Sequence, residues 1–226
     1  MNFRERRPCR FFIFDLDGTL IDSRADITFA LNAALTRIQM PPLRESRVVD
    51  FVGNGVRRLV EESLRETNGH EPESELTEKL IVLFREEYGN HLLDQTRLCD
   101  GVSKGLDRLS WATFAVVSNK PEGFSRRILE GLGIAHRFCA ILGGDSIRKR
   151  KPDPEALLKA METCSASLPE TAMVGDSAVD IEAGKAAGVT TCGVLGGFRP
   201  KEELEAAGCD LIIHNLTELA DHFRAP

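Results

Sequence analysis

The stretch Arg10-Phe11-Phe12-Ile13-Phe14-Asp15-Leu16-Asp17-Gly18-Thr19-Leu20 places two aspartates directly after a short apolar run. Such a run is typical of a strand buried in a parallel sheet. Side chains alternate along an extended backbone, so Asp15 and Asp17 are expected to point the same way. Two carboxylates on one side repel each other unless a cation or a proton intervenes. Gly18 lets the backbone turn sharply and approach a ligand closely. Taken alone, the pattern is equally typical of an Asp-Gly turn with solvated acids.

The rest of the chain alternates between short apolar runs and amphipathic stretches, which is typical of an α/β protein. Strands are predicted at residues 113–117, 139–142, 172–174, 190–194 and 211–213, and helices at 102–109, 121–132, 154–164, 178–187 and 201–207. Between residues 22 and 91 the apolar residues recur at helical spacing, and no strand is predicted there. We therefore expect a parallel sheet covered by helices on both faces, with an all-helical insertion after the first strand.

Polar residues follow several of these predicted strands. Ser118 and Asn119 come just before a helix that begins at Pro121, where donors suit an oxyanion but are also ordinary capping residues. Lys151 lies in a basic loop that precedes another Pro-initiated helix. Asp176 follows a further strand, and Asp180 lies at the start of the next helix.

These residues belong together because ligands of open parallel sheets bind beyond the carboxyl ends of the strands. Several acids form an oxygen-rich site suited to Mg²⁺, while a hydroxyl, an amide and an ammonium suit a phosphoryl group. No G-x-x-x-x-G-K motif occurs, so the sequence predicts phosphoryl transfer without a P-loop.

The motifs Asp15-Leu16-Asp17-Gly18-Thr19, Ser118-Asn119, Lys151-Pro152 and Gly175-Asp176-Ser177-x-x-Asp180 resemble the four motifs of the haloacid dehalogenase-like hydrolase superfamily. The match runs from about Arg10 to Leu219. The resemblance implies a Rossmann-like, doubly wound core formed by residues 1–21 and 92–226, with a helical cap domain at residues 22–91.

The resemblance also implies a role for each matching residue. Asp15 would attack phosphorus and form an aspartyl-phosphate, and Asp17 would act as general acid and then as general base. Mg²⁺ would be held by Asp15, by the backbone carbonyl of Asp17, and by Asp176, with Asp180 orienting these ligands. The substrate's phosphoryl group would meet Gly18, Ser118, Asn119 and Lys151, with Ser118 and Lys151 also counted as catalytic.

Within the superfamily, the chain most resembles phosphoglycolate phosphatases. The resemblance rests on residues 16–23, on Val52-Gly53-Asn54-Gly55-Val56 and on Gly143-Gly144-Asp145-Ser146. It implies the hydrolysis of 2-phosphoglycolate to glycolate and phosphate. Arg57 and Arg58 are candidates for binding a substrate carboxylate, although solvated arginines are the more usual case.

Alternative functions remain open from the sequence alone. The substrate could be a sugar phosphate, a nucleotide or pyrophosphate, and a phosphomutase would use the same nucleophile. A dehalogenase fits less well because Asp17 is present, and a phosphonatase needs a cap lysine where the chain offers only Lys79, within a predicted helix. A catalytically silent phosphate-binding protein is the alternative outside the enzymes.

The composition restricts the kinds of partner and the cellular location that are expected for this chain. The net charge of −6 and pI near 5.5 argue against nucleic acid, and no membrane-spanning segment is predicted, so the partner is expected to be a small phosphorylated metabolite. A monomer and a homodimer both remain possible. The scattered cysteines predict reduced thiols and a cytoplasmic protein. The basic first ten residues predict a solvated terminus, and the glycines at 193–197 predict a loop near the site.

Overall fold

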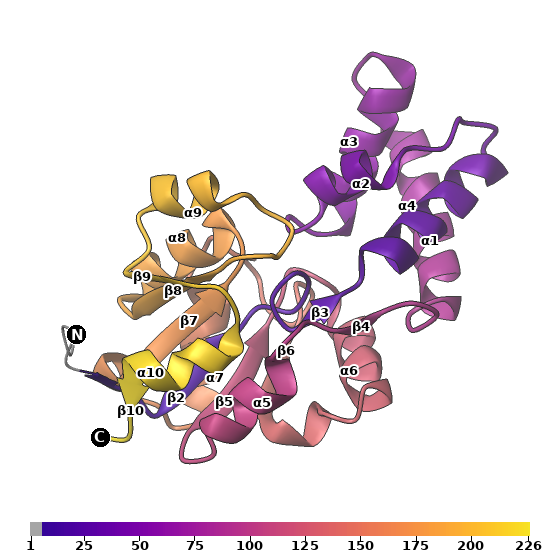
Figure 1. The fold of residues 1–226 in the computed structure, drawn as a ribbon. Coiled ribbons are helices and arrows are strands. Elements are labelled where there is room, and N and C mark those ends of the chain that lie inside the picture. The colour runs from indigo at the N-terminus through magenta and orange to yellow at the C-terminus, as the bar shows by residue number, and fades with distance from the viewer. Residues whose placement is uncertain (1–5) are drawn as a thin grey trace. The chain divides into compact units, whose positions relative to one another are not determined.

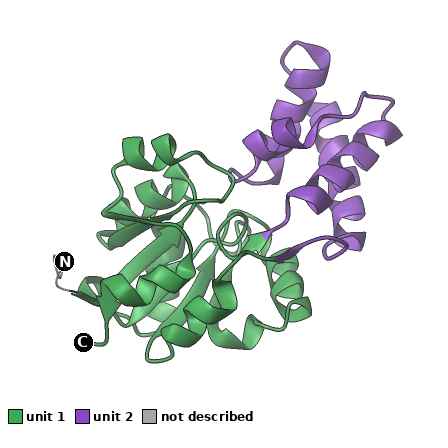
Figure 2. Cartoon of the chain, in the orientation of Figure 1, with its two compact units in different colours: residues 1–21, 98–226 green, residues 22–97 purple. Residues whose placement is uncertain are grey.

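The computed structural model describes residues 6–226 (Figure 1). The chain forms two compact units, one made of Met1–Ile21 and Leu98–Pro226 and the other of Asp22–Arg97 (Figure 2). The two short segments that join them, β3 (Ile21–Asp22) and β4 (Arg97–Leu98), pair as a two-stranded sheet.

The first unit is built on a six-stranded sheet in the order β6-β5-β2-β7-β8-β9, and every neighbouring pair is parallel. Its strands are β2 (Phe11–Phe14), β5 (Thr113–Val117), β6 (Phe138–Leu142), β7 (Thr171–Gly175), β8 (Thr190–Val194) and β9 (Leu211–Ile213). The predicted α/β class with a parallel sheet is therefore confirmed.

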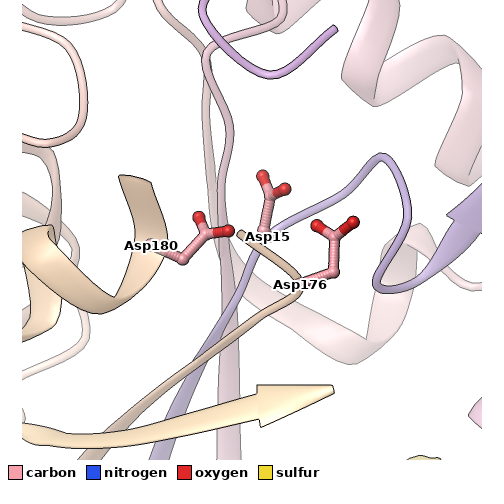
Figure 3. A group of neighbouring side chains, drawn as sticks. All are labelled: Asp15, Asp176 and Asp180. Atoms are coloured by element: carbon pink, nitrogen blue, oxygen red, sulfur yellow. The ribbon is translucent and has the colours of Figure 1, made fainter. Parts of the chain in front are cut away.

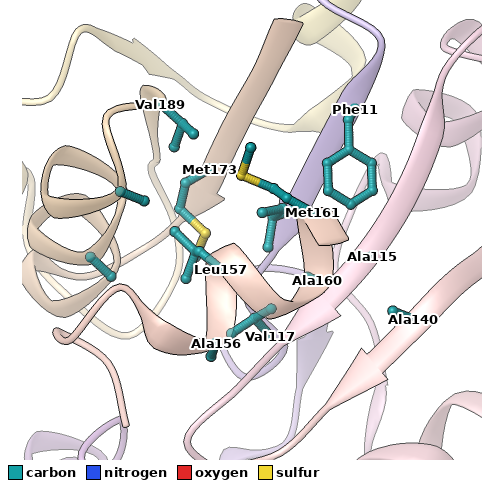
Figure 4. Packing of buried hydrophobic residues seen from close by; sticks show 13 residues of the cluster. Phe11, Ala115, Val117, Ala140, Ala156, Leu157, Ala160, Met161, Met173 and Val189 are labelled. Atoms are coloured by element: carbon teal, nitrogen blue, oxygen red, sulfur yellow. The ribbon is translucent and has the colours of Figure 1, made fainter. Parts of the chain in front are cut away.

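Helices cover both faces of this sheet, as expected for a doubly wound fold. They are α5 (Val102–Arg108), α6 (Glu122–Gly131), α7 (Glu155–Thr163), α8 (Ala178–Ala187), α9 (Lys201–Ala207) and α10 (Leu219–His222). On one face, Phe11 and Ile13 pack in a buried cluster with side chains of α7 such as Leu157 (Figure 4). Phe12 points to the other face, where its ring lies 5.2 Å from that of Phe223. This alternation along β2 buries both sides of the strand.

The order of the strands places a switch point beside β2. The chain leaves β2 and continues through β5 and β6 on one side, then returns to form β7, β8 and β9 on the other. The last residue of β2, Phe14, is level with Val116 of β5 and Val174 of β7. Residues that follow these strands therefore gather at one edge of the sheet, where ligands of such folds bind.

The second unit contains four helices, α1 (Arg24–Arg37), α2 (Glu45–Phe51), α3 (Val56–Asn68) and α4 (Ser74–Asn90). The short α2 was not predicted, because it buries one residue, Val48, and so shows no apolar period. The unit runs to Arg97 rather than to residue 91. The reason is the buried Asp26, whose carboxylate accepts hydrogen bonds from the backbone N–H groups of Gln95 and Thr96.

The beginning of the described chain is held in place. Strand β1 (Arg7–Pro8) pairs in parallel with β10 (Phe223–Arg224), and the N–H of Cys9 donates to the carbonyl of Arg224. The prediction of a solvated terminus is confirmed for the side chains of Arg6, Arg7 and Arg10, which are exposed, although the backbone of residues 7–9 is bound by β10; Arg4 lies outside the described residues.

One cysteine pair corrects the expectation of reduced thiols. Cys139 in β6 and Cys164, directly after α7, form a disulfide with Cα atoms 6.1 Å apart. The sequence could not show this pair, since the packing of α7 beside β6 brings together two residues that are 25 positions apart. Within residues 6–226, no helix combines the length and the apolar character that a membrane span requires.

We expect the disulfide to stabilise the first unit. In the chain-entropy model, closing a loop of 25 residues contributes roughly 3 kcal/mol, so Cys164→Ser should lower the free energy of unfolding by about that amount. Urea unfolding under non-reducing conditions measures the change. The control is Cys209→Ser, since Cys209 lies outside the bridge. If dithiothreitol leaves the wild-type transition unmoved, the disulfide does not form in solution.

Candidate active site

Asp15 lies at the switch point, directly after β2. Its backbone N–H donates to the carbonyl of Val174 at 2.9 Å, which extends the pairing of β2 with β7 by one residue. Its carboxylate Oδ1 accepts a hydrogen bond from Lys151 Nζ at 2.8 Å. Both side chains are almost fully buried. The predicted nucleophile and the predicted lysine are thus in direct contact.

Two further carboxylates complete an acidic cluster with Asp15. One carboxylate oxygen from each of Asp15, Asp176 and Asp180 lies within 4.8 Å of the other two, and Figure 3 shows the three side chains together. Asp176 directly follows β7, and its Oδ2 accepts from the backbone N–H of Phe198 at 2.6 Å. The stretch 193–197 was predicted to be a loop near the site; its last residue directly precedes Phe198, whereas Gly193 and Val194 belong to β8 and not to a loop.

Both oxygens of Asp180 are already engaged. Its Oδ1 accepts from Lys151 at 2.6 Å, and its Oδ2 accepts from the hydroxyl of Ser177 at 2.7 Å. Because Asp180 lies in the first turn of α8, the helix itself fixes the position of this carboxylate. These contacts favour the predicted orienting role of Asp180 over direct ligation of a metal.

Two glycines leave room for Asp176. Gly18 has φ +85°, and a Cβ there would come 2.2 Å from Asp176 Oδ2. A Cβ at Gly197 would come 2.4 Å from the same oxygen and 2.6 Å from the carbonyl of Gly18. Side chains at these positions would fill the space of the carboxylate. The glycine of the D-x-D-G pattern is thus required both by its backbone angle and by its close approach to Asp176.

The electrostatics of the cluster indicate a cation site. Burial, and next the negative charge of Asp180, raise the pKa of Asp15 to about 7, against the pull of Lys151. Burial and the charges of Asp15 and Asp180 raise the pKa of Asp176 well above its usual value. Burial disfavours the charge of Lys151, but the two carboxylates outweigh it and raise the pKa of this lysine.

If the three carboxylates of this cluster are ionised, they and the ammonium of Lys151 carry a net charge of −2 in a buried site. A hard divalent cation with a preference for oxygen ligands would balance that excess. The residues present therefore fit a metal of the Mg²⁺ type.

Asp17 has a partner that the sequence did not reveal. Its carboxylate Oδ1 accepts a hydrogen bond from Lys120 Nζ at 2.6 Å, and both side chains are less than a tenth exposed. The side chain of Asp17 is not part of the acidic cluster, so its predicted place among the metal ligands rests on its backbone carbonyl alone. Lys120 was missed because a lysine before a Pro-initiated helix usually lies in solvent.

Ser118 and Asn119 follow β5 and are buried beside the other strand ends. The hydroxyl of Ser118 accepts from the backbone N–H of Lys120 at 3.3 Å. The amide of Asn119 donates to the carbonyl of Lys151 at 3.0 Å. Asn119 therefore has a structural task, which is to tie the loop that carries Lys151 to the end of β5.

Comparisons with known proteins agree with this geometry. The model of the haloacid dehalogenase-like hydrolase family matches residues 12–194. The chain belongs to this family. A phosphoglycolate phosphatase of Neisseria meningitidis is 38% identical over 93% of this chain and 92% of the relative. One of Chromobacterium violaceum is 35% identical, covering 92% of this chain and 93% of the relative.

A crystal structure similar to this fold is that of a predicted phosphoglycolate phosphatase from Haemophilus somnus. It is 28% identical to this chain, with a TM-score of 0.85, and the match covers 93% of this chain and 96% of that structure. The whole of the haloacid dehalogenase-like fold, including the inserted helical unit, thus has counterparts among solved structures.

We expect the metal-free protein to lose stability as the pH rises from about 4 to about 7. The pKa of Asp15 rises from 3.8 to about 7 on folding, so in this range the folded chain holds a proton that the unfolded chain has released. Added Mg²⁺ should raise the melting temperature more at pH 8 than at pH 5, because the ion replaces that proton.

Thermal unfolding in EDTA and in Mg²⁺, measured across this pH range, tests the expectation. Asp15→Asn should reduce the pH dependence, with Asp176 supplying the rest, whereas the matched control Asp100→Asn, at an exposed position, should preserve it in full. A metal-free wild type that is most stable near pH 7 would contradict this assignment of the pKa of Asp15.

We also expect Gly197→Ala to weaken Mg²⁺ binding by at least about tenfold, since the new Cβ would displace the carboxylate of Asp176 or the backbone of Gly18. Titration calorimetry with MgCl₂ measures the affinity directly. Gly123→Ala in α6, where a Cβ meets open space, is the control. Equal affinities of the two variants would show that Asp176 does not hold the ion.

Proposed function

We propose that this chain is a Mg²⁺-dependent phosphatase that hydrolyses 2-phosphoglycolate through an aspartyl-phosphate on Asp15. The observation that carries the proposal is the pair of buried carboxylates after β2, each bound by its own lysine, at the switch point of the sheet. One carboxylate is positioned to attack and the other to exchange protons, as a two-step displacement requires.

In the first step, a carboxylate oxygen of Asp15 forms a bond to phosphorus. The bond between phosphorus and the ester oxygen breaks, and the leaving oxygen takes the electron pair together with a proton from Asp17. Lys151 faces Asp15 at 2.8 Å, so its ammonium offsets the negative charges that meet when a phosphate approaches a carboxylate.

In the second step, Asp17 removes a proton from a water molecule, whose oxygen forms a bond to phosphorus. The bond between phosphorus and Asp15 then breaks, its electron pair returns to the carboxylate, and inorganic phosphate leaves. Asp17 regains in this step the proton that it gave up in the first, so the enzyme ends as it began.

Mg²⁺ would be held by Asp15, by Asp176 and by the carbonyl of Asp17, where it would neutralise the phosphoryl oxygens. Asp180 keeps Lys151 and the start of α8 in place beside these ligands. Ser118, Asn119 and the backbone after Gly18 would receive the phosphoryl group. The buried hydroxyl of Ser118 and the turn of Gly18 support this assignment.

Two observations support the choice of 2-phosphoglycolate. Relatives that bear the name phosphoglycolate phosphatase match more than nine tenths of this chain at 35–38% identity. A structural neighbour from Haemophilus somnus carries the same description. The proposal keeps the expected small phosphorylated metabolite as the partner and assigns no nucleic acid.

The residue that would bind the substrate's carboxylate is not assigned. Arg57 forms ion pairs with Glu61 and Glu78, and Arg58 pairs with Glu62. These contacts make both arginines part of the charged surface of α3 and α4. The choice between monomer and homodimer stays open, as it was from the sequence. The cytoplasmic location is a prediction, and the Cys139–Cys164 bridge removes one argument for it.

Phosphate release from a panel of phosphomonoesters tests the substrate. The panel holds 2-phosphoglycolate, sugar phosphates, nucleoside monophosphates and pyrophosphate, each with Mg²⁺ and with EDTA. We expect kcat/KM to be highest for 2-phosphoglycolate and to vanish in EDTA. A higher kcat/KM for another compound would overturn the substrate and keep the mechanism.

Asp15→Asn tests the mechanism. Removing the nucleophile should lower kcat by roughly 1,000-fold or more, while Asp100→Asn leaves it unchanged. Mass spectrometry of the acid-quenched wild type should find a phosphoryl group on Asp15. Near-normal turnover by Asp15→Asn would overturn the proposed nucleophile.

A further inference from the structure

Lys120 is a buried charge that the proposed mechanism has not used. It follows Ser118 and Asn119 at the end of β5, precedes Pro121, and is 9% exposed. A lysine is seldom buried this deeply unless its ammonium has a partner of opposite charge. That partner is Asp17, with Nζ and Oδ1 at 2.6 Å.

We propose that Lys120 is the positioning residue for Asp17, and that the loop Gly143–Ser146 holds Lys120 in the place where it does so. The proposal rests on the proposed function, because it assigns to Lys120 the orientation of the group that serves as acid and then as base. The ammonium binds Oδ1, so the carboxyl of Asp17 cannot rotate freely about its bond to Cβ.

Such an orientation matters because the carboxyl must serve two acceptors in turn. It gives a proton to the leaving oxygen and then takes one from the attacking water, and both lie on the side of phosphorus opposite Asp15. If the carboxyl of Asp17 rotated away between the two steps, no base would be in place to activate water, and hydrolysis of the aspartyl-phosphate would slow. Lys151 cannot hold Asp17, since its ammonium binds Asp15 and Asp180.

The loop Gly143–Ser146 comes from the end of β6 and packs on the backbone that carries Lys120. The N–H of Gly144 donates to the carbonyl of Lys120 at 2.9 Å. A Cβ at Gly143 would come 2.1 Å from the backbone nitrogen of Glu122 and 2.7 Å from the carbonyl of Lys120. A Cβ at Gly144 would come 2.5 Å from the carbonyl of Asn119. The two glycines thus allow an approach that no other residue type permits.

Asp145 and Ser146, the two polar residues of this loop, bind the start of α6, the helix that follows Lys120. Asp145 accepts a hydrogen bond from the backbone N–H of Glu122 at 2.8 Å, and Ser146 donates to the carboxylate of Glu122. Asp145 therefore binds a donor of the first turn of α6, as a capping side chain does. The Gly-Gly-Asp-Ser sequence thus gains a physical reason, which is to hold residues 119–122 from the neighbouring strand end.

The first test is a double-mutant cycle between the two partners. Lys120→Met should lower kcat by about 100-fold and change KM by less than threefold, and Lys120→Arg should recover much of kcat. In an Asp17→Asn background the same Lys120→Met change should alter kcat by less than threefold, because no carboxylate remains to be positioned. Equal losses in both backgrounds would overturn the proposal.

The double variant removes both buried charges at once, so we expect it to fold even if Lys120→Met alone does not. If Lys120→Met alone does not fold, two measurements still test the proposal. They are the activity of Lys120→Arg and the comparison of Asp17→Asn with and without Lys120→Met. A loss in Lys120→Met/Asp17→Asn relative to Asp17→Asn would then show a task for Lys120 that does not pass through Asp17.

The second test separates the positioning of Asp17 from the binding of phosphate. With p-nitrophenyl phosphate the leaving group needs no proton, so a burst of p-nitrophenol should survive in Lys120→Met, followed by slow turnover as water attack is impaired. If Lys120 binds the phosphoryl group instead, the burst itself slows and KM rises, which would contradict the proposal.

Gly143→Ala should show the same retained burst and slow turnover in milder form, with Gly123→Ala as control. The activity of the wild type distinguishes failure of the proposed function from failure of the proposed role of Lys120. If it hydrolyses no phosphomonoester, the proposed function fails and the role of Lys120 fails with it. If it is active and the cycle is additive, only the role of Lys120 fails.

Discussion

The site depends on the two ion pairs that Lys151 forms. Its Nζ donates hydrogen bonds to Asp15 at 2.8 Å and to Asp180 at 2.6 Å, and the side chain is almost completely buried. A buried charge is tolerated only while its partners stay in place, and removing one partner costs about 3–5 kcal/mol. The end of β2, the loop before α7 and the first turn of α8 must therefore meet at one point.

The same contacts leave an excess of negative charge in the buried cluster. One ammonium cannot neutralise three carboxylates, and the pKa of Asp15 accordingly rises to about 7. The proposed attack of Asp15 on phosphorus needs the ionised carboxylate, which the raised pKa disfavours. A divalent ion held by Asp15 and Asp176, as proposed, would lower that pKa, so the same cation would stabilise the cluster and keep Asp15 ionised.

Sequence reasoning reached the parallel sheet and the polar residues that follow its strands, because apolar runs and D-x-D-G are local signals, but it did not give the order of the strands in the sheet. It missed features that depend on packing between distant segments. Cys139 and Cys164 meet through the packing of α7 beside β6, and the unit boundary at Arg97 follows from Asp26. The role of Lys120 could not be predicted from the sequence, since its partner Asp17 lies 103 residues away.

Asp15 and Asp17 therefore each pair with a lysine from a different loop. These two ion pairs offset the repulsion between the carboxylates that the D-x-D-G pattern predicts. Lys151 comes from the loop after β6 and serves Asp15, while Lys120 comes from the loop after β5 and serves Asp17. The two loops are tied together by Asn119, whose amide donates to the carbonyl of Lys151, and by the contact of Gly144 with Lys120. A shift of either loop would disturb both ion pairs, so Asp15 and Asp17, the proposed nucleophile and acid–base group, are positioned together rather than independently.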